Sequence, residues 1–149
     1  MTDNTFFGKF PGFEPDPSAP VSNEFFRLAR HMRWRPGSKR FSKMRAECFR
    51  SEFAVYFGND ASRLQNWQSL CLELGIRENI GSITQCRKKL SRVHVNIVDL
   101  IDGRRTGDEP PMFPSMKALR RYTRSMGKFF PKEEAKAEGF LKALLRKVL

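Results

Sequence analysis

Cysteine and histidine are the residues of this sequence with the widest chemical reach. Cys71 and Cys86 precede His94 along the chain, and an imidazole next to a thiol is the pair that activates a cysteine nucleophile. Both cysteines stand among apolar residues at helical spacing, where a thiol packs as a small inert side chain. We therefore expect core cysteines and a histidine at the edge of the core, and no catalytic pair.

Metal and nucleotide motifs are also missing from the sequence. The three cysteines lie 23 and 15 residues apart and the two histidines stand alone, so neither a disulfide framework nor a zinc site is expected. The tripeptide at 37–39 resembles the end of a phosphate-binding loop, but the residues before it lack the required glycine. No G-x-G-x-x-G, G-x-S-x-G or H-E-x-x-H motif occurs. We expect no metal and no cofactor.

Two carboxylates near the end of a predicted helix raise the alternative of a nuclease-like site. Asp99 and Asp102 share one stretch of chain with Arg104 and Arg105. Ion pairs between these acids and arginines at the end of the helix explain the pattern more simply. The sequence therefore predicts a protein that is not an enzyme.

Basic residues are the dominant chemical feature. The 149 residues carry 28 Lys and Arg against 16 Asp and Glu, a net charge of +12, and 17 of the 28 are arginines, whose planar fork binds phosphate through two hydrogen bonds. Residues 27–50 hold nine basic side chains against one acid, and residues 115–128 hold five and no acid. A third cluster lies at 87–92. Each Lys or Arg placed on a phosphate releases condensed counterions, so nucleic acid, DNA or RNA, is the expected partner.

Helical geometry selects the residues that would make these contacts. At about 100° per residue, one face of each helix gathers the basic side chains, and in the third cluster it adds two amides that could read adenine. The predicted nucleic-acid-binding residues are Lys39, Lys43, Arg50, Gln85, Lys88, Lys89, Arg92, Asn96, Lys117, Arg121, Arg124 and Lys128. Trp34 is expected in the core, with base stacking as the alternative. The alternative function is an adaptor that docks an acidic protein through the basic helices and the N-terminal arm.

The elements that must position these residues are all helical. Ser22 is predicted to cap a helix over about 23–34, with Val21 and Phe26 as its hydrophobic staple. Ser38, Ser82 and Ser115 are predicted to open three further helices, over 39–57, 82–102 and 116–128. Asp60 or Ser62 opens one running to about 74, with Gln65 completing a capping box, and a last helix follows Pro131. The stretch 103–114 is predicted to be a loop.

The fold predicted from these elements is all-α. About six helices form an irregular or orthogonal bundle over 22–149, preceded by an extended Pro- and Phe-rich arm over 1–21. The phenylalanines of the arm are expected to pack onto the helical domain, with docking on a partner as the alternative. No apolar run is long enough to span a membrane and the N-terminus does not resemble a signal peptide, so we expect an intracellular protein, nuclear rather than cytoplasmic.

Three runs of this sequence carry a resemblance. They are FPGFEPDPSAP over 10–20, WQSLCLELGI over 67–76 and SITQCRKKLSRVHVNIVDLID over 82–102. Together they resemble short basic helical proteins of filamentous fungi. The resemblance spans most of the chain, and it implies no activity and no functional residue.

Overall fold

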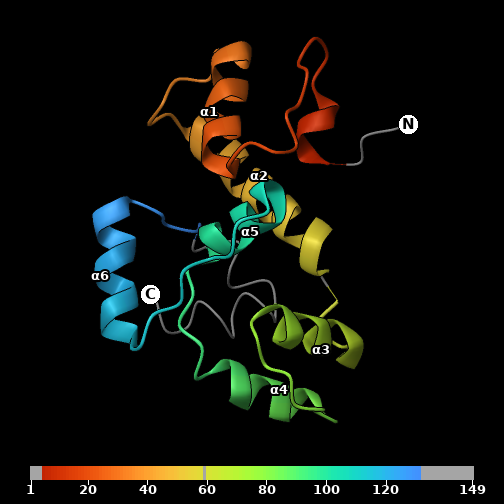
Figure 1. The fold of residues 1–149 in the computed structure, drawn as a ribbon. Coiled ribbons are helices and arrows are strands. Elements are labelled where there is room, and N and C mark those ends of the chain that lie inside the picture. The colour runs from red at the N-terminus through yellow and green to blue at the C-terminus, as the bar shows by residue number, and fades with distance from the viewer. Residues whose placement is uncertain (1–4, 59, 132–149) are drawn as a thin grey trace.

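Six α-helices and one short 3₁₀ helix form the regular structure of residues 5–58 and 60–131, the part of the chain that the computed structural model describes. In order they are η1 (Phe6–Lys9), α1 (Val21–Met32), α2 (Lys39–Phe57), α3 (Leu64–Glu73), α4 (Ile83–Leu90), α5 (Ile97–Thr106) and α6 (Met116–Met126) (Figure 1). The predicted all-α class is confirmed. Within these residues, β pairing is limited to one isolated bridge between Val95 and Met112. The helix predicted after Pro131 lies outside the described residues.

Three helices begin at the serines that predict them. Ser38, Ser82 and Ser115 have extended backbones, and each hydroxyl accepts a hydrogen bond from the N–H three residues further on, at 3.2, 3.2 and 3.1 Å. A side-chain oxygen at this position satisfies an N–H that has no partner inside the helix. The signal is local, so the sequence suffices to place these starts.

The start of α1 differs from its prediction. The helix begins at Val21, and Ser22 does not cap it; the Val21 N–H donates instead to Asp102 Oδ1 of α5 at 2.7 Å. Val21 is fully buried, whereas the Phe26 side chain is 51% exposed, so the predicted staple between them is wrong. A carboxylate 81 residues away supplies the cap, and local sequence cannot show that.

The start of α3 also differs. The helix begins at Leu64, after an N-cap residue, Arg63, that makes no capping bond with its side chain. Asp60 Oδ1 accepts the Ser62 N–H at 3.0 Å and the Ser62 hydroxyl at 2.5 Å. The Ser62 hydroxyl therefore stabilises a turn before the helix, and the predicted capping box with Gln65 is wrong.

The single helix predicted over 82–102 is divided in two. α4 ends at Leu90, where the hydroxyl of Ser91 donates to Lys88 O at 2.6 Å. α5 begins after Asn96, whose side chain accepts the Asp99 N–H at 3.1 Å. The residues between them run in another direction, and Val95 pairs with Met112 there. α5 then continues to Thr106 through part of the predicted loop.

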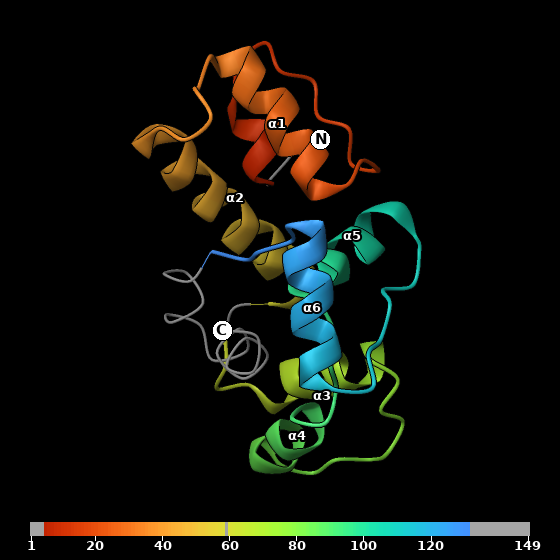
Figure 2. The ribbon, with the colours of Figure 1, turned by 90° about the vertical axis from the view of Figure 1, so that its left-hand side faces the viewer.

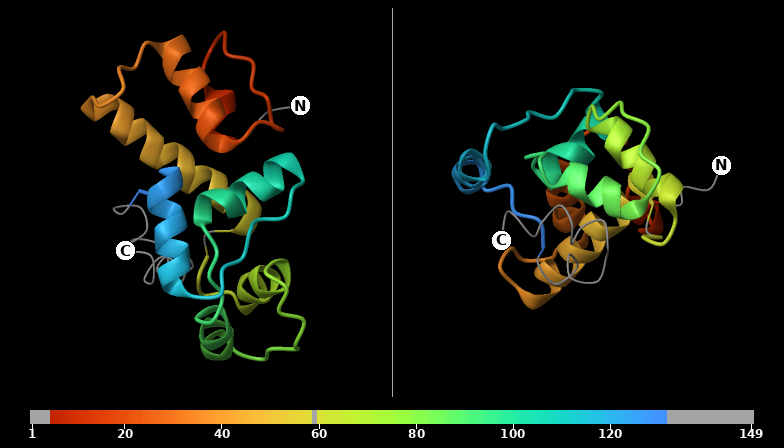
Figure 3. Two further views of the ribbon diagram at one scale, coloured as in Figure 1. Left: turned by 60° about the vertical axis from the view of Figure 1, so that its left-hand side comes forward. Right: turned by 90° about the horizontal axis from the view of Figure 1, so that it is seen from below.

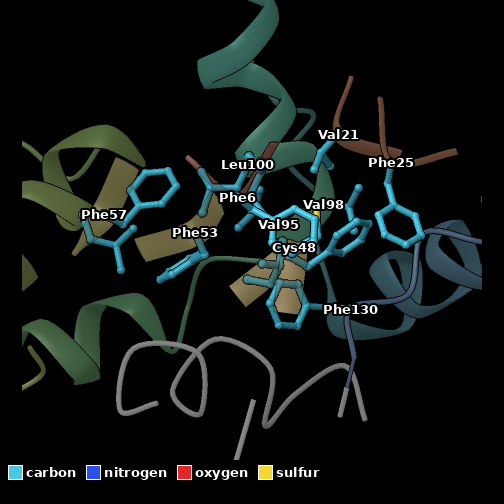
Figure 4. Packing of buried hydrophobic residues seen from close by; sticks show 14 of the residues in the cluster. Phe6, Val21, Phe25, Cys48, Phe53, Phe57, Val95, Val98, Leu100 and Phe130 are labelled. Carbon is cyan, nitrogen blue, oxygen red and sulfur yellow. The ribbon is translucent and has the colours of Figure 1, made fainter. Parts of the chain in front are cut away.

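The core lies where the arm, α1, α2 and α5 meet. Figure 4 shows side chains from all four segments packed together, among them Phe6 of the arm, Phe25 of α1, Phe53 of α2 and Leu100 of α5. Phe7 and Phe13 of the arm are buried in the same cluster. The prediction that the phenylalanines pack onto the helical domain is thus confirmed for these rings.

Both tryptophans belong to this core. Trp67 is fully buried and its indole N–H donates to Ala61 O at 2.7 Å. Trp34 is 9% exposed and packs between Phe25 and Phe10, with ring centroids 6.1 and 5.5 Å away. The expected packing of Trp34 in the core is confirmed.

The helices are arranged along one long direction. Figures 1, 2 and 3 agree that the arm and α1 lie at one end and that α3 and α4 lie at the other, with α2 and α5 between them. α6 runs along the side of the molecule, from the level of α3 toward that of α2 (Figure 2). Among the described helices, none combines the length and the apolarity that crossing a membrane requires.

Candidate nucleic-acid interface

The outward face of α6 is the simplest of the basic surfaces. Leu119 and Thr123 are the buried residues of this helix. Lys117, Arg121 and Arg124 project about 120° to 180° away from them around the helix axis and are exposed. Within the described part of the chain, none of these three cations has a carboxylate partner. We call these three residues the α6 face.

Lys128 does not extend the α6 face, although its spacing predicts that it does. The helix ends at Met126, and the left-handed backbone of Gly127 turns the chain. The Lys128 ammonium then donates to Asp99 Oδ1 at 2.7 Å and to Tyr122 Oη at 2.9 Å. Burial lowers the pKa of this ammonium, but the bonds to Asp99 and Tyr122 outweigh burial and raise its pKa above the usual range. Lys128 is an internal tie between α5 and α6.

The basic residues of α4 gather around a hollow of about 320 Å³. Gln85, Lys88, Lys89 and Arg92 line it together with residues 78–80 of the preceding loop. Four of the five predicted residues of this cluster are therefore neighbours. Lys89 is engaged by Glu78, whose carboxylate lies 2.9 Å from its ammonium, so Lys88 and Arg92 carry the free charge.

Asn96 is the fifth predicted residue of that cluster, and the structure places it elsewhere. Its side chain is buried, with 3% of its surface exposed. The amide donates to Thr123 Oγ1 at 3.1 Å and to Lys128 O at 2.9 Å, while its oxygen caps α5. The helical projection failed because the helix ends at Leu90, and this amide has no capacity left for a base.

The predicted residues of α2 lie along one helix. Lys39 and Lys43 are exposed in its first two turns, whereas Arg50 is half-buried and makes a further interaction. The first turn of α2 contains no acid, so Lys39 stands at the positive end of the helix dipole without a compensating carboxylate in that turn. Near the middle of the helix, Arg45 donates to Phe129 O at 2.6 Å, which brings α2 beside the segment that follows α6.

A fourth basic surface was not among the predicted site residues. A hollow of about 420 Å³ opens between α1 and α2, and its lining includes Phe26, Arg30, Arg33 and Arg35. Phe26, Arg30 and Arg33 follow one another at helical spacings of four and three, which a projection of α1 would have revealed. The predicted staple gave Phe26 an interior role and hid that pattern. We call this site the α1–α2 hollow.

These surfaces lie on different parts of the molecule. Helix α1, which lines the α1–α2 hollow, lies toward one end of the molecule, α4 lies toward the other, and α6 runs along the side between them (Figures 2 and 3). The fold therefore does not gather the separate basic segments into a common docking area. The basic residues instead form three separate surfaces: one on α1 and α2, one on α4, and one on α6.

The candidate catalytic groups of the sequence are engaged in the fold. Tyr122 Oη donates to Asp99 Oδ2 at 2.6 Å, and Asp102 accepts the Val21 N–H. Burial raises the pKa of Asp102. The expected ion pairs with Arg104 and Arg105 are not formed by these aspartates: the arginines bind Glu73 and Glu52 instead.

The cysteines are buried and free of disulfides. Burial, with a contribution from the neighbouring Cys86, raises the pKa of Cys71 to about 12, and burial also raises the pKa of Cys48. These thiols are therefore protonated near neutral pH and are poor nucleophiles. In the described part of the chain, no group of three His, Cys, Asp or Glu is placed to hold a metal ion.

Comparison of this chain with protein-family models, with curated proteins and with solved structures found no match.

Proposed function

We propose that this chain is a non-enzymatic nucleic-acid-binding protein that contacts phosphates through basic helix faces. The α6 face carries the proposal. Lys117, Arg121 and Arg124 are exposed, and in the described part of the chain no carboxylate neutralises them. Like charges four residues apart destabilise a helix by a few tenths of a kcal/mol per pair, and a polyanion would offset that repulsion.

The distribution of ion pairs supports an external anion. Three cations have carboxylate partners within the chain: Arg105 pairs with Glu52, Arg104 with Glu73, and Lys128 with Asp99. These three carboxylates therefore neutralise cations that connect one element of the fold to another. Other cations remain exposed to solvent, namely Lys88, Arg92 and the α6 face. A phosphate backbone can reach these side chains. We propose the nucleus as the compartment, since a basic nucleic-acid-binding protein finds its polyanion there.

The test is a titration of labelled duplex DNA, single-stranded DNA and RNA, followed by fluorescence anisotropy. If 6 to 10 phosphates are engaged, we expect affinity for duplex DNA to fall about 10³- to 10⁵-fold between 50 and 200 mM salt. The triple variant Lys117→Gln/Arg121→Gln/Arg124→Gln should lower the slope of log affinity against log salt by about two to three units, because three contacts are lost.

A second triple variant controls for net charge. Lys9, Arg63 and Arg77 are exposed and lie outside the basic surfaces, so changing all three to Gln removes the same charge. We expect a much smaller change of slope. Equal slopes for the two triple variants would refute a defined interface. Absence of binding to all three nucleic acids at low salt would refute the function and favour the acidic protein partner.

A further inference from the structure

The α1–α2 hollow combines an open aromatic ring with several cations. Phe26 is 51% exposed, and its ring lies 5.6 Å from that of Phe41, which is buried beneath it. The guanidinium groups of Arg30, Arg33 and Arg35 belong to exposed residues on the lining of the same hollow. Its volume of about 420 Å³ lies within the range of about 300–1,000 Å³ typical of small-molecule sites.

The arginines of the hollow differ from their neighbour on the same helix. Arg27 is held by the Glu24 carboxylate, with its Nε 2.8 Å from Glu24 Oε1, and it also donates to Glu14 O at 2.6 Å. Arg30, Arg33 and Arg35 have no carboxylate partner among the residues that the structure describes. Their charge is therefore available to a ligand.

The backbone of Arg33 is a second and independent observation. Its φ of 60° and ψ of 36° are left-handed, and among the described residues it alone has a positive φ without being glycine. At this C-cap position glycine or asparagine relieves the clash that a larger side chain suffers. Such conformations are concentrated at ligand sites, where the side chain is needed in spite of the cost. Here the cost places a guanidinium on the rim of the hollow.

We propose that the α1–α2 hollow receives an unpaired base of a single-stranded nucleic acid, with Phe26 as the stacking ring and the three arginines as contacts to the flanking phosphates. The inference rests on the proposed function and adds its substrate class. An aromatic ring stacks on any base, but only when the base is not enclosed in a duplex. The exposed ring and the cations around it match a planar base between two phosphates, whereas in a duplex the faces of the bases are stacked on one another and are closed to the ring.

The experiment measures anisotropy with a 12-nucleotide single strand, the duplex of the same sequence, and a nucleoside monophosphate as competitor. We expect Phe26→Ala to weaken single-strand binding about 5- to 150-fold, the range that corresponds to one stacked base. Duplex binding should change less than twofold. Leu72→Ala is the matched control, since Leu72 is 62% exposed on α3, away from the hollow. Thermal unfolding of both variants checks that the fold is intact.

A second pair of variants tests the cation without disturbing the fold. Arg33→Asn and Arg63→Asn each remove one positive charge at a helix-capping position that accepts asparagine. Arg33→Asn should weaken single-strand binding several-fold more than Arg63→Asn does. A strand carrying 2-aminopurine should change its fluorescence on binding the wild type and not on binding Phe26→Ala.

The outcomes separate the two proposals. If the α6 triple variant reduces binding while Phe26→Ala leaves single-strand binding unchanged, the inference about the hollow is refuted and the proposed function stands. Equal losses on single strand and duplex also refute the inference. If the monophosphate binds as tightly as the single strand and its binding depends on Phe26, the ligand of the hollow is a free nucleotide. That result refutes a single strand as the ligand. If no nucleic acid binds at low salt, both proposals fail.

Discussion

Replacement of Arg105 by methionine tests how the N-terminal arm is held to the helices. The guanidinium lies 3.0 Å from Glu52 Oε1 of α2, and the two side chains are 2% and 0% exposed. It also donates to the backbone carbonyls of Ala19 and Asp16, at 2.5 and 2.8 Å, and covers the ring of Phe7 at 5.1 Å. One side chain of α5 therefore joins α2 and three points of the arm.

The size of the expected loss in unfolding free energy follows from the burial of this ion pair. Removing one partner of a buried ion pair typically costs about 3–5 kcal/mol, because the remaining charge keeps its desolvation penalty. Methionine restores most of the apolar volume, so we expect the free energy of unfolding of Arg105→Met to fall within that range. The double variant Arg105→Met/Glu52→Leu removes both charges and should recover most of the loss.

Arg104→Met is the matched control. Arg104 is the adjacent residue, and its partner Glu73 lies 2.8 Å away, but their side chains are 43% and 30% exposed. Exposed pairs contribute about 0–1 kcal/mol. Urea denaturation at pH 7 gives the free energies, and limited chymotrypsin digestion reports exposure of the arm at Phe7. Equal stability of Arg105→Met and Arg104→Met would refute the anchoring role, as would a double variant no more stable than Arg105→Met.

Three shorter predictions concern the interior. Gly103→Ala should destabilise the protein by about 1–3 kcal/mol in urea, because its Cβ would lie 2.8 Å from Asp108 O, while Gly81→Ala, with open space around it, should be nearly neutral. Cys71 should resist a thiol reagent at pH 8 until the protein is unfolded, since its pKa is raised to about 12; rapid labelling of the native state would contradict this. Burial raises the pKa of Asp102 above 3.8 in the folded state. The contribution of this carboxyl to the free energy of unfolding therefore decreases as pH rises above 3.8. In Asp102→Asn, this part of the pH dependence of the unfolding free energy should disappear.

The sequence predicts those parts of the fold that depend on neighbours in the chain. Ser38 and Ser115 mark helix starts because their capping bonds reach only three residues. The break between α4 and α5 was missed because the apolar stripe keeps helical spacing across it. What stops the helix comes from afar: Val95 pairs with Met112, and the Asn96 amide binds groups of α6 and the segment after it.

The candidate site shows the same division. Composition and helical spacing locate clusters of cations, but they do not show which cations are already bound within the fold. Lys89 is engaged by Glu78 and Lys128 by Asp99, partners that become visible only when the chain is folded. Conversely, Phe26 is exposed because other residues, among them Phe25 and Leu28, form the buried face of α1.

The two proposed surfaces differ in a way that salt can reveal. The α6 face holds only cations, so its contribution to affinity comes from counterion release and declines as salt is added. The Phe26 ring contributes by stacking, which releases no counterions. The factor by which the α6 triple variant weakens binding should therefore become smaller between 50 and 200 mM salt. The factor by which Phe26→Ala weakens single-strand binding should stay constant. Two losses that shrink in parallel would mean that Phe26 acts only through the placement of the arginines beside it, and the hollow would then be a phosphate site without a base.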